Sequence, residues 1–499
     1  MHIEINNVEG KIIEPLTIDK LAAIQMECQF KVEGAEYKAY AYRNKKRGGF
    51  EYDGYKKLFN IQTRRFPVGL LRRVVNVASR FDTVDIVDKR VHLNDVYDYK
   101  FDKSYLRDYQ HSAILTSVIH GNGIVKVATG GGKTVIAGYT IGILRKKSIF
   151  IVHTRDLLYQ AIESFKRIFP GEKIGQIGDG LIDLQNITVA TMQTLAILGG
   201  IKATKNKYDE DYDNQEEELS DGDINIHKKR FNEYVNSVQC VMMDEVQIVC
   251  SQTASAVRFM FKSADYAFGY SASPWRDDGS DLAIEAAFGE RIVNVTASEL
   301  IRRGYLVKPQ IYIKYCGYEY NRFGLDNRKD YQYIYKKYIV ENYSRNCKIV
   351  RDAVDQYNDG MNTLILVTQI IHGNTLAELI KSLYDIDVMF ISGKSGMKKR
   401  KQAIEDMRNG KIQLMVASTI ADVGLDIPRL DCIVEAGAGK SSVTALQRLG
   451  RIMRTFGDKD TCKFITYRDV APFICNHVDK KIEIWKTEEE FVINEEEIL

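Results

Sequence analysis

Two adjacent carboxylates stand at the end of an apolar run, Cys240-Val-Met-Met-Asp-Glu-Val-Gln-Ile-Val249. The run has the length and composition of a buried strand, and Asp244 and Glu245 terminate it. A carboxylate that is buried without a partner is costly, so this pair needs a metal ion, a cationic side chain or neutralisation. A solvated loop after the strand is the simpler interpretation, and the rest of the sequence decides between the two.

A glycine-rich turn precedes these carboxylates in the chain. The stretch Ile124–Ile136 joins a predicted strand to a predicted helix through Thr129, Gly130, Gly131, Gly132, Lys133 and Thr134. Backbone N–H groups of such a turn can close around phosphate oxygens, Lys133 can reach the β- and γ-phosphates, and the Thr134 hydroxyl can bind Mg²⁺. The strict Walker pattern has glycine where this chain has Val127, and an ordinary glycine turn is the alternative.

Taken together, the turn and the carboxylates predict a site for nucleotide phosphates and Mg²⁺. Asp244 suits Mg²⁺, through water ligands, because magnesium sheds its hydration reluctantly. Glu245 suits the activation of the attacking water. Two further candidates for this site, Arg451 and Arg454, stand three residues apart and would share one face of a helix. Two guanidinium groups there suit the transition-state charge of a phosphoryl group, and a solvated basic helix face is the alternative.

Six short motifs follow one another in a defined order: LRDYQ from Leu106, ATGGGKT from Ala128, DEVQ from Asp244, SAS from Ser271, GLDIP from Gly424 and QRLGRIMR from Gln447. This order, over about residues 100–470, resembles the superfamily 2 helicases and translocases. The resemblance implies two RecA-like domains that bind ATP in the cleft between them and nucleic acid across the top. It also implies enzymatic ATP hydrolysis.

The resemblance assigns a role to each motif. Gln110, with Arg107 beside it, would contact adenine, and the residues of the glycine-rich turn would hold the phosphates and Mg²⁺. Ser271 and Ser273 would couple the nucleotide to the DNA, together with Gln247, which replaces the usual histidine or aspartate and can still donate and accept. The remaining assignments are nucleotide contacts from Gly424 and Asp426, and a second catalytic group of Gln447, Arg451 and Arg454, with Arg454 as the arginine finger.

Strand and helix patterns indicate how these motifs are positioned. Short apolar runs at 124–128, 148–152, 187–190, 238–243 and 266–270 predict one parallel sheet, and runs at 363–367, 388–392, 413–417, 431–435 and 462–466 predict a second. The predicted fold is α/β, two tandem RecA-like parallel-sheet domains preceded by a small α+β domain. The predicted ranges are 1–97, 98–300 with an acidic insertion at 205–225, and 301–499.

The first predicted domain is strongly basic. Residues 38–90 contain 14 Lys and Arg against 5 Asp and Glu, in a chain whose net charge is only +3. Aromatic residues are interleaved with the cations, which suits phosphate contacts combined with stacking, whereas a solvated basic surface is the alternative. The candidate DNA contacts are Arg43, Lys45, Lys46, Arg47, Lys56, Lys57, Arg64, Arg65, Arg72 and Arg73. The acidic insertion is either a mobile loop or a DNA mimic.

Two further resemblances narrow the function. The stretch SELIRRGYLVKP from Ser298 resembles XPB-type and UvsW-type DNA enzymes, and Phe50–Tyr55 with Phe66–Arg73 resembles the small duplex-binding domain of the UvsW type. The resemblance implies an ATP-dependent enzyme that unwinds or remodels forks and Holliday junctions. An RNA helicase of the same superfamily and a nucleotide-gated DNA-binding or nuclease-motor subunit remain the alternatives.

Composition limits the cellular setting. No uncharged apolar run is long enough to span a membrane, and Met1–Glu9 lacks the features of a secretory signal. The eight cysteines are scattered singly, which indicates reduced thiols used for packing rather than zinc ligands or disulfides. We therefore expect a cytoplasmic protein, in a phage-infected or bacterial cell.

Overall fold

The computed structural model describes residues 1–32, 53–101, 106–201, 221–273, 280–316, 330–418, 427–439 and 442–496. The chain divides into two compact units. The first unit holds most of the chain from Met1 to Asn294, and the second holds Val295–Leu499 together with the short segment Ala128–Gly131. The domain limits predicted at 97/98 and 300/301 stay predictions. Within the described ranges, no helix is long and apolar enough to cross a membrane.

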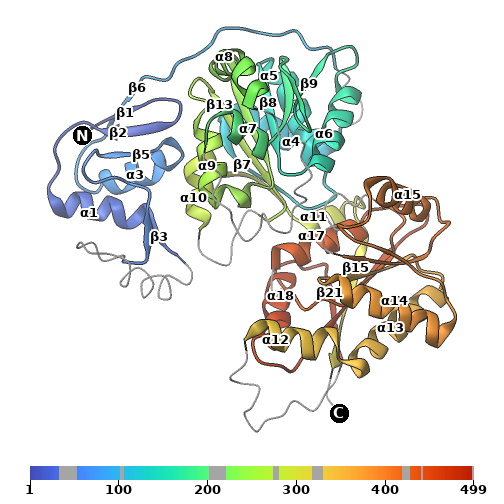
Figure 1. The fold of residues 1–499 in the computed structure, drawn as a ribbon. Helices are drawn as coiled ribbons and strands as arrows, with labels where there is room; N and C mark the ends of the chain where they lie inside the picture. The colour runs from blue at the N-terminus through green and yellow to red at the C-terminus, as the bar shows by residue number, and fades with distance from the viewer. Residues whose placement is uncertain are drawn as a thin grey trace. The chain divides into compact units, whose positions relative to one another are not determined.

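The first unit contains an eight-stranded α/β sheet, drawn in cyan to green in Figure 1. Its strand order is β10-β9-β11-β8-β12-β13-β7-β14, with β10 antiparallel to β9 and parallel pairing from β9 through to β7. The strands are β7 (Asn122–Val127), β8 (Ser148–Val152), β9 (Ile174–Gly178), β10 (Leu181–Asp183), β11 (Ile187–Thr191), β12 (Cys240–Asp244), β13 (Tyr266–Ser271) and β14 (Arg291–Val295). The helices are α4 (Asp108–His120), α5 (Lys133–Leu144), α6 (Arg155–Ile168), α7 (Met192–Leu198), α8 (Asp221–Ser237), α9 (Gln252–Phe259) and α10 (Asp281–Phe288).

The central strands of this sheet are buried along their whole length, which is why their sequences are apolar throughout rather than alternating. Helix α6, by contrast, is amphipathic and buries one face that includes Leu158 and Phe165. Its first turn is capped by the Thr154 hydroxyl, which accepts from the Leu157 N–H at 3.3 Å.

The second unit contains a seven-stranded sheet in which every neighbouring pair is parallel, in the order β17-β18-β16-β19-β20-β15-β21. Its strands are β15 (Lys308–Cys316), β16 (Thr363–Val367), β17 (Met389–Ile391), β18 (Leu414–Ser418), β19 (Cys432–Glu435), β20 (Thr461–Asp469) and β21 (Val492–Glu495). Its helices are α11 (Ala297–Arg302), α12 (Tyr331–Tyr335), α13 (Tyr343–Asn358), α14 (Ile370–Tyr384), α15 (Met397–Arg408), α17 (Ser442–Ile452) and α18 (His477–Trp485), shown in yellow to red in Figure 1. Two α/β sheets in tandem confirm the predicted fold class.

A small α+β assembly precedes the first α/β sheet and belongs to the same unit (blue in Figure 1). Its mixed sheet has the order β5-β2-β1-β6, and a separate hairpin joins β3 to β4. The elements are β1 (His2–Ile5), β2 (Glu9–Ile12), α1 (Ile18–Glu27), β3 (Gln29–Lys31), β4 (Tyr55–Lys57), β5 (Arg65–Pro67), α3 (Leu71–Ala78) and β6 (Asp85–Asp88). Most of the predicted acidic insertion lies outside the described residues.

The core of this N-terminal assembly is completed by residues of helix α10. Its apolar cluster, which includes Ile3, Phe66 and Val74, also contains Leu282 and Ala286 of helix α10. Gly69 approaches α10 so closely that a β-carbon at this position would lie 2.1 Å from the carbonyl oxygen of Glu285. Only glycine allows two backbones to come this near, so the N-terminal assembly is packed firmly on the first α/β sheet.

Candidate nucleotide-binding and hydrolysis site

The topology of the first sheet collects the predicted site residues at one edge. Strands β8, β12, β13 and β7 are neighbours and run parallel, so their carboxyl ends lie at the same edge. His153 follows β8, Asp244 ends β12, Ser271 ends β13, and the glycine-rich turn follows β7. Open α/β sheets bind their ligands outside this edge.

The glycine-rich turn has the backbone that a phosphate-binding loop needs. Gly130 and Gly132 have φ angles of +85° and +79°, which an L side chain would adopt only with strain. Helix α5 begins directly after the turn, so its first N–H groups and its positive dipole end face the region where the turn opens. Lys133, the first residue of α5, places its Nζ 3.5 Å from Oε1 of Glu245.

Asp244 and Glu245 occupy different environments although they are adjacent. Asp244 is buried, and burial, followed by the charge of Glu245, raises the pKa of Asp244 to about 6. Burial opposes ionisation of Glu245 as well, but the Lys133 ammonium and the Gln247 amide outweigh it and hold the pKa of Glu245 below its ordinary value. Glu245 therefore carries the negative charge that Lys133 faces.

The backbone of Glu245 is strained. Its φ angle is +50°, in the left-handed region that residues other than glycine rarely occupy. Such strain of about 1–3 kcal/mol persists only where the surroundings impose it, and it concentrates at functional sites. Here the turn carries the chain from β12 into the short helix Val246–Cys250 and leaves Glu245 between Lys133 and Gln247.

Gln247 makes the expected amide link in both directions. Its Nε2 donates to Oε2 of Glu245 at 2.8 Å, and its Oε1 accepts from the Ser271 hydroxyl at 2.7 Å. The Ser271 hydroxyl also accepts from the N–H of Ser273 at 3.0 Å. An unbroken path of polar contacts thus leads from Lys133 to Ser273, and every member of the amide pair is used.

Gln110 lies against the phosphate turn rather than at the surface. Its side chain is buried, its Oε1 accepts from the N–H of Arg107 at 3.0 Å, and its Nε2 lies beside the α-carbon of Gly132. The first contact caps helix α4 and thereby fixes the side chain. Adenine recognition by Gln110 and Arg107 stays a prediction, as do the phosphate and Mg²⁺ contacts of Thr129, Gly131 and Thr134.

The second catalytic group is arranged differently from the prediction. Gln447 and Arg451 lie on α17, but this helix ends at Ile452. Arg454 lies beyond it and forms an isolated β-bridge with Leu306, next to the N–H of Val307, which donates to the carbonyl of Met453 at 2.8 Å. The prediction that Arg451 and Arg454 share a helix face is therefore wrong, because strand pairing interrupts the helix between them. Their catalytic roles stay predictions.

Sequence analysis missed two residues that the structure connects to these motifs. His153 is buried at the end of β8, and its charge favours the ionised form of Glu245. Arg448, within the QRLGRIMR motif, is buried and donates to Oε1 of Glu435 at 2.6 Å. The signal for Arg448 was its position in the motif, whereas nothing in the sequence near His153 marks it.

The described basic residues of the N-terminal assembly differ in the contacts that their side chains make within the protein. Arg73 makes a bidentate pair with Glu285, at 2.6 and 2.8 Å. Arg72 pairs with Glu290, Arg65 with Glu9, and Lys57 with Asp53. Lys56 stands over the ring of Phe30, and Arg64 occupies a tight turn with a φ angle of +58°. The other predicted DNA contacts, Arg43, Lys45, Lys46 and Arg47, lie outside the described residues, as do Gly424 and Asp426.

Comparisons with known proteins agree with this arrangement. Residues 103–272 match the family described as "Type III restriction enzyme, res subunit", and residues 345–456 match "Helicase conserved C-terminal domain". Both α/β sheets thus carry a recognised family match.

Three curated relatives are similar over most of the chain. "Putative helicase 22" of Sulfolobus islandicus filamentous virus is 27% identical, over 78% of this chain and 68% of its own length. "DNA 3'-5' translocase XPB2" of Sulfurisphaera tokodaii is 24% identical, over 71% of this chain and 79% of its own. "ATP-dependent DNA helicase uvsW" of Enterobacteria phage T4 is 24% identical, over 70% of this chain and 66% of its own.

A solved structure shows the same fold. It is Saccharomyces cerevisiae Dbp5 bound to RNA and ADP BeF3, which is 15% identical and covers 78% of this chain and 89% of its own, with a TM-score of 0.52. At this identity the similarity concerns the fold alone. With these two family matches and the three relatives together, the chain belongs to the superfamily 2 helicases and translocases, as an ATP-hydrolysing member similar to the UvsW type.

Proposed function

We propose that this protein is an ATP-dependent DNA translocase that remodels branched DNA, such as forks and four-way junctions. The observation that carries the ATP-driven part is the polar path from Lys133 through Glu245 and Gln247 to Ser271. Support for DNA as the substrate comes from the relatives, one named as a DNA helicase and one as a DNA translocase.

The residues at the strand edge fit a magnesium–nucleotide complex. The raised pKa of Asp244 beside ionised Glu245 means that a further cation at this place would favour ionisation of both carboxylates. Oxygen donors from Asp244 and Thr134 are of the kind that Mg²⁺ prefers. When bound, Mg²⁺ would neutralise charge on the phosphates. Gly130, Gly132 and Lys133 would bind the phosphates, and Gln110 and Arg107 would orient the base.

Glu245 would act as the base for the attacking water. Its pKa lies below the ordinary value, so it is ionised at neutral pH and can accept a proton. Its strained backbone holds the carboxylate toward the phosphate turn, which keeps the base in place without a conformational search. In this proposal the Nε2 of Gln247 donates to the same carboxylate, and its Oε1 accepts from Ser271. A change in the position or protonation of Glu245 would therefore shift Gln247 and, through it, Ser271.

DNA contact by the N-terminal assembly is proposed for only part of the predicted basic set. Arg73 is bound by two hydrogen bonds to a carboxylate whose side chain is only 15% exposed, and this pair stabilises the packing on α10 instead. Arg72 is 71% exposed, and an exposed ion pair is worth only about 0–1 kcal/mol, so it can exchange its partner for a phosphate. Lys56 beside Phe30 combines a cation with a ring and is the best described candidate.

The central experiment compares ATP turnover of the full chain on single strands, duplex, forks and four-way junctions. We expect the greatest stimulation by forks or junctions, and ATP-driven branch migration with the same substrates. The Glu245→Gln variant serves as the matched control, since it should bind the same DNA without turnover. Stimulation by RNA over every DNA form would favour the RNA helicase alternative. DNA binding gated by ATP without sustained turnover would favour the nuclease-motor alternative.

A second experiment tests the DNA contacts. Each phosphate neutralised by a cation adds about 0.9 to the log–log slope of binding against salt. Lys56→Gln with Arg72→Gln should therefore flatten the slope for a labelled junction by up to about 1.8. Lys89→Gln, which removes another cation paired on the N-terminal assembly, is the comparison variant. Equal slopes in the wild type and the double variant would contradict DNA contact by these residues.

A further inference from the structure

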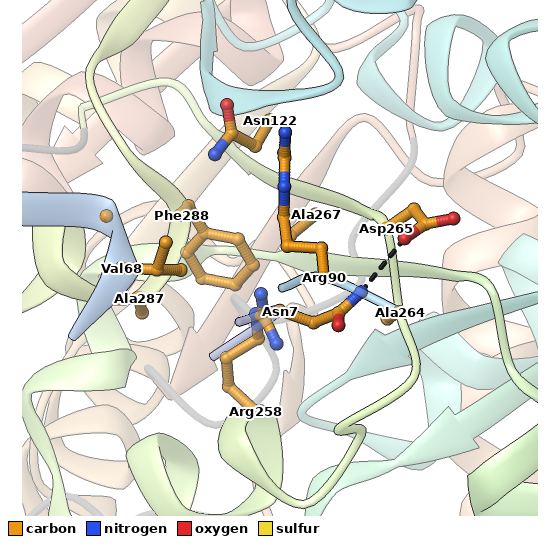
Figure 2. A pocket seen from close by; sticks show the side chains of 11 residues that line it. Asn7, Val68, Arg90, Asn122, Arg258, Ala264, Asp265, Ala267, Ala287 and Phe288 are labelled. Carbon is orange, nitrogen blue, oxygen red and sulfur yellow. Dashed lines mark hydrogen bonds between the residues drawn. The ribbon is translucent and has the colours of Figure 1, made fainter. Parts of the chain in front are cut away.

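A small cavity lies where the N-terminal assembly meets the first α/β sheet, both within the first unit (Figure 2). Its volume is about 20 Å³. Polar side chains reach it from both sides, as Figure 2 shows: Asn7 and Arg90 from the N-terminal assembly, and Asn122, Arg258 and Asp265 from the sheet and its helices. None of these residues belongs to the nucleotide site.

Arg258 is the unusual member of this cavity. It comes from helix α9, is only 2% exposed, and its guanidinium carbon lies 5.6 Å from the centre of the Phe288 ring. Its Nε and Nη1 are buried and have no acceptor within hydrogen-bonding distance among the described residues, and no described carboxylate forms an ion pair with it. Burial lowers the pKa of Arg258 to about 10, which still leaves the guanidinium charged at neutral pH. A buried cation left in this state is strongly unfavourable.

The carboxylate of the cavity is already engaged. Asp265 accepts from Nδ2 of Asn7 at 2.9 Å and pairs with Nδ1 of His92 at 3.1 Å. The amide oxygen of Asn7 accepts from the N–H of Val91 at 2.8 Å. Arg90, the second cation on the wall, donates to Asp88. Asp265 is thus held by Asn7 and His92, and among the described residues it forms no ion pair with Arg258.

Size and charge together define what fits. A volume of about 20 Å³ is enough for one particle of the size of a water molecule and too small for a phosphate or sulfate group. A neutral water would supply an acceptor for Arg258 but would not balance its charge. We propose that the cavity binds one monatomic anion, with chloride as the probe, between Arg258 and the N-terminal assembly.

This anion would join two parts of the first unit. Arg258 would contact it from α9, and Arg90 would contact it from the N-terminal assembly, because both amide hydrogens of Asn7 are already donated to Val91 and Asp265. The attachment of that assembly therefore has an ionic component, besides the shared apolar core and the Arg73–Glu285 pair. Because the cavity is small, the effect is specific to anions small enough to enter, unlike general screening by salt.

The test uses thermal unfolding of the full-length protein at constant ionic strength, with chloride replaced stepwise by isethionate, which is too large for the cavity. Raising chloride from about 10 mM to about 300 mM should increase Tm of the first transition by about 2–4 °C, in a saturating manner. Arg258→Met keeps the length of the side chain and removes its charge, so its Tm should not respond. Arg80→Met, at an exposed position, should respond like the wild type.

Crystals of the wild-type protein soaked in bromide provide a decisive second measurement, which does not depend on the variant folding. An anomalous peak within reach of Arg258 is the expected result. Identical Tm values in chloride and isethionate, or a water molecule at this place and no bromide, would overturn the proposal.

Discussion

Each α/β sheet buries a carboxylate at the end of a central strand, but the charge around it is balanced in opposite ways. In the first sheet, Asp244 ends β12 and Glu245 follows it, with the ammonium of Lys133 3.5 Å from the Glu245 carboxylate. In the second, Glu435 ends β19 and accepts from two cations, Arg448 at 2.6 Å and Lys481 at 2.5 Å, and from the Thr466 hydroxyl at 2.9 Å.

This difference distinguishes carboxylates that suit a bound cation from a carboxylate whose charge is already balanced by protein side chains. In the first sheet, burial and then the charge of Glu245 raise the pKa of Asp244, and an incoming cation would favour its ionised form. In the second sheet, burial works against ionisation of Glu435, yet Lys481 and Arg448 hold its pKa below the ordinary value. Glu435 therefore serves the packing of α17 and α18 on the sheet, and the orientation of the motif that contains Arg448.

The largest effect should come from Glu245→Gln. This change removes the proposed base and keeps the shape of the side chain, so kcat for ATP should fall by about 10²–10⁴-fold while nucleotide is still bound. Because the pKa of Glu245 lies below its ordinary value, the ionised carboxylate stabilises the fold at neutral pH, and the substitution should lower stability only slightly. Steady-state ATPase assays and thermal unfolding measure the two outcomes. Parental turnover would remove Glu245 from the mechanism.

Glu435→Gln should show the opposite profile. It leaves two buried cations without a counter-charge, and breaking a buried pair in this way costs about 3–5 kcal/mol. Urea unfolding followed by the fluorescence of the buried Trp485 reports on the second unit, in a Trp275→Phe background. Asp479→Asn, which removes an exposed partner of Arg468, should cost about 1 kcal/mol or less. Equal losses in the two variants would break the comparison.

A smaller effect is expected for Gln247→Ala. The substitution interrupts the path between Glu245 and Ser271 without removing the base itself. Basal ATPase should change little, whereas stimulation by DNA should fall by about 5–30-fold, since coupling energies are commonly 1–2 kcal/mol. Gln247→His, which restores the residue usual in the superfamily, should retain much of the stimulation. A proportional loss of basal and stimulated rates would argue against a coupling role.

The smallest effect concerns a buried histidine of the second unit. Burial, and then the charge of Arg345, lowers the pKa of His372 to about 3. As pH falls from about 6.5 toward 3, the unfolded chain binds a proton that the folded chain does not, so stability decreases by up to about 1.4 kcal/mol per pH unit. The His372→Gln variant should lack this part of the dependence of unfolding free energy on pH. Urea unfolding between about pH 5 and 7, followed by the fluorescence of Trp485, measures this dependence. The same dependence of stability on pH in the variant and the wild type would contradict a lowered pKa of His372.

Local sequence patterns were sufficient to predict the central strands. The predicted ranges 148–152 and 363–367 coincide with β8 and β16, and the other predicted runs overlap β7, β11, β12, β13, β17, β18, β19 and β20. Strands such as β8, β12 and β16 are buried on both faces, and this burial makes their sequences continuously apolar. Strands β9, β14, β15 and β21 were missed, since glycine or polar residues interrupt their apolar pattern.

The site was predictable where one motif contains all the partners and less so where distant segments meet. Gln247 and Glu245 are two residues apart, and their contact follows from the turn between them. The pairing of Arg73 with Glu285 and of Arg448 with Glu435 depends on tertiary packing, which no local pattern reports. The same holds for Arg454, whose β-bridge with Leu306 ended a helix that propensity would have continued.

The close approach of Gly69 to helix α10 has a consequence for how this protein can change. Gene fusion or recombination can exchange a domain only where its interface tolerates new side chains. At Gly69 this interface leaves no space for even a β-carbon. An N-terminal assembly grafted from a relative would need its own matching α10, including the residues that complete its core. The unit that would have to be exchanged as a whole is therefore discontinuous in sequence, and consists of residues 1–88 together with helix α10 (Asp281–Phe288).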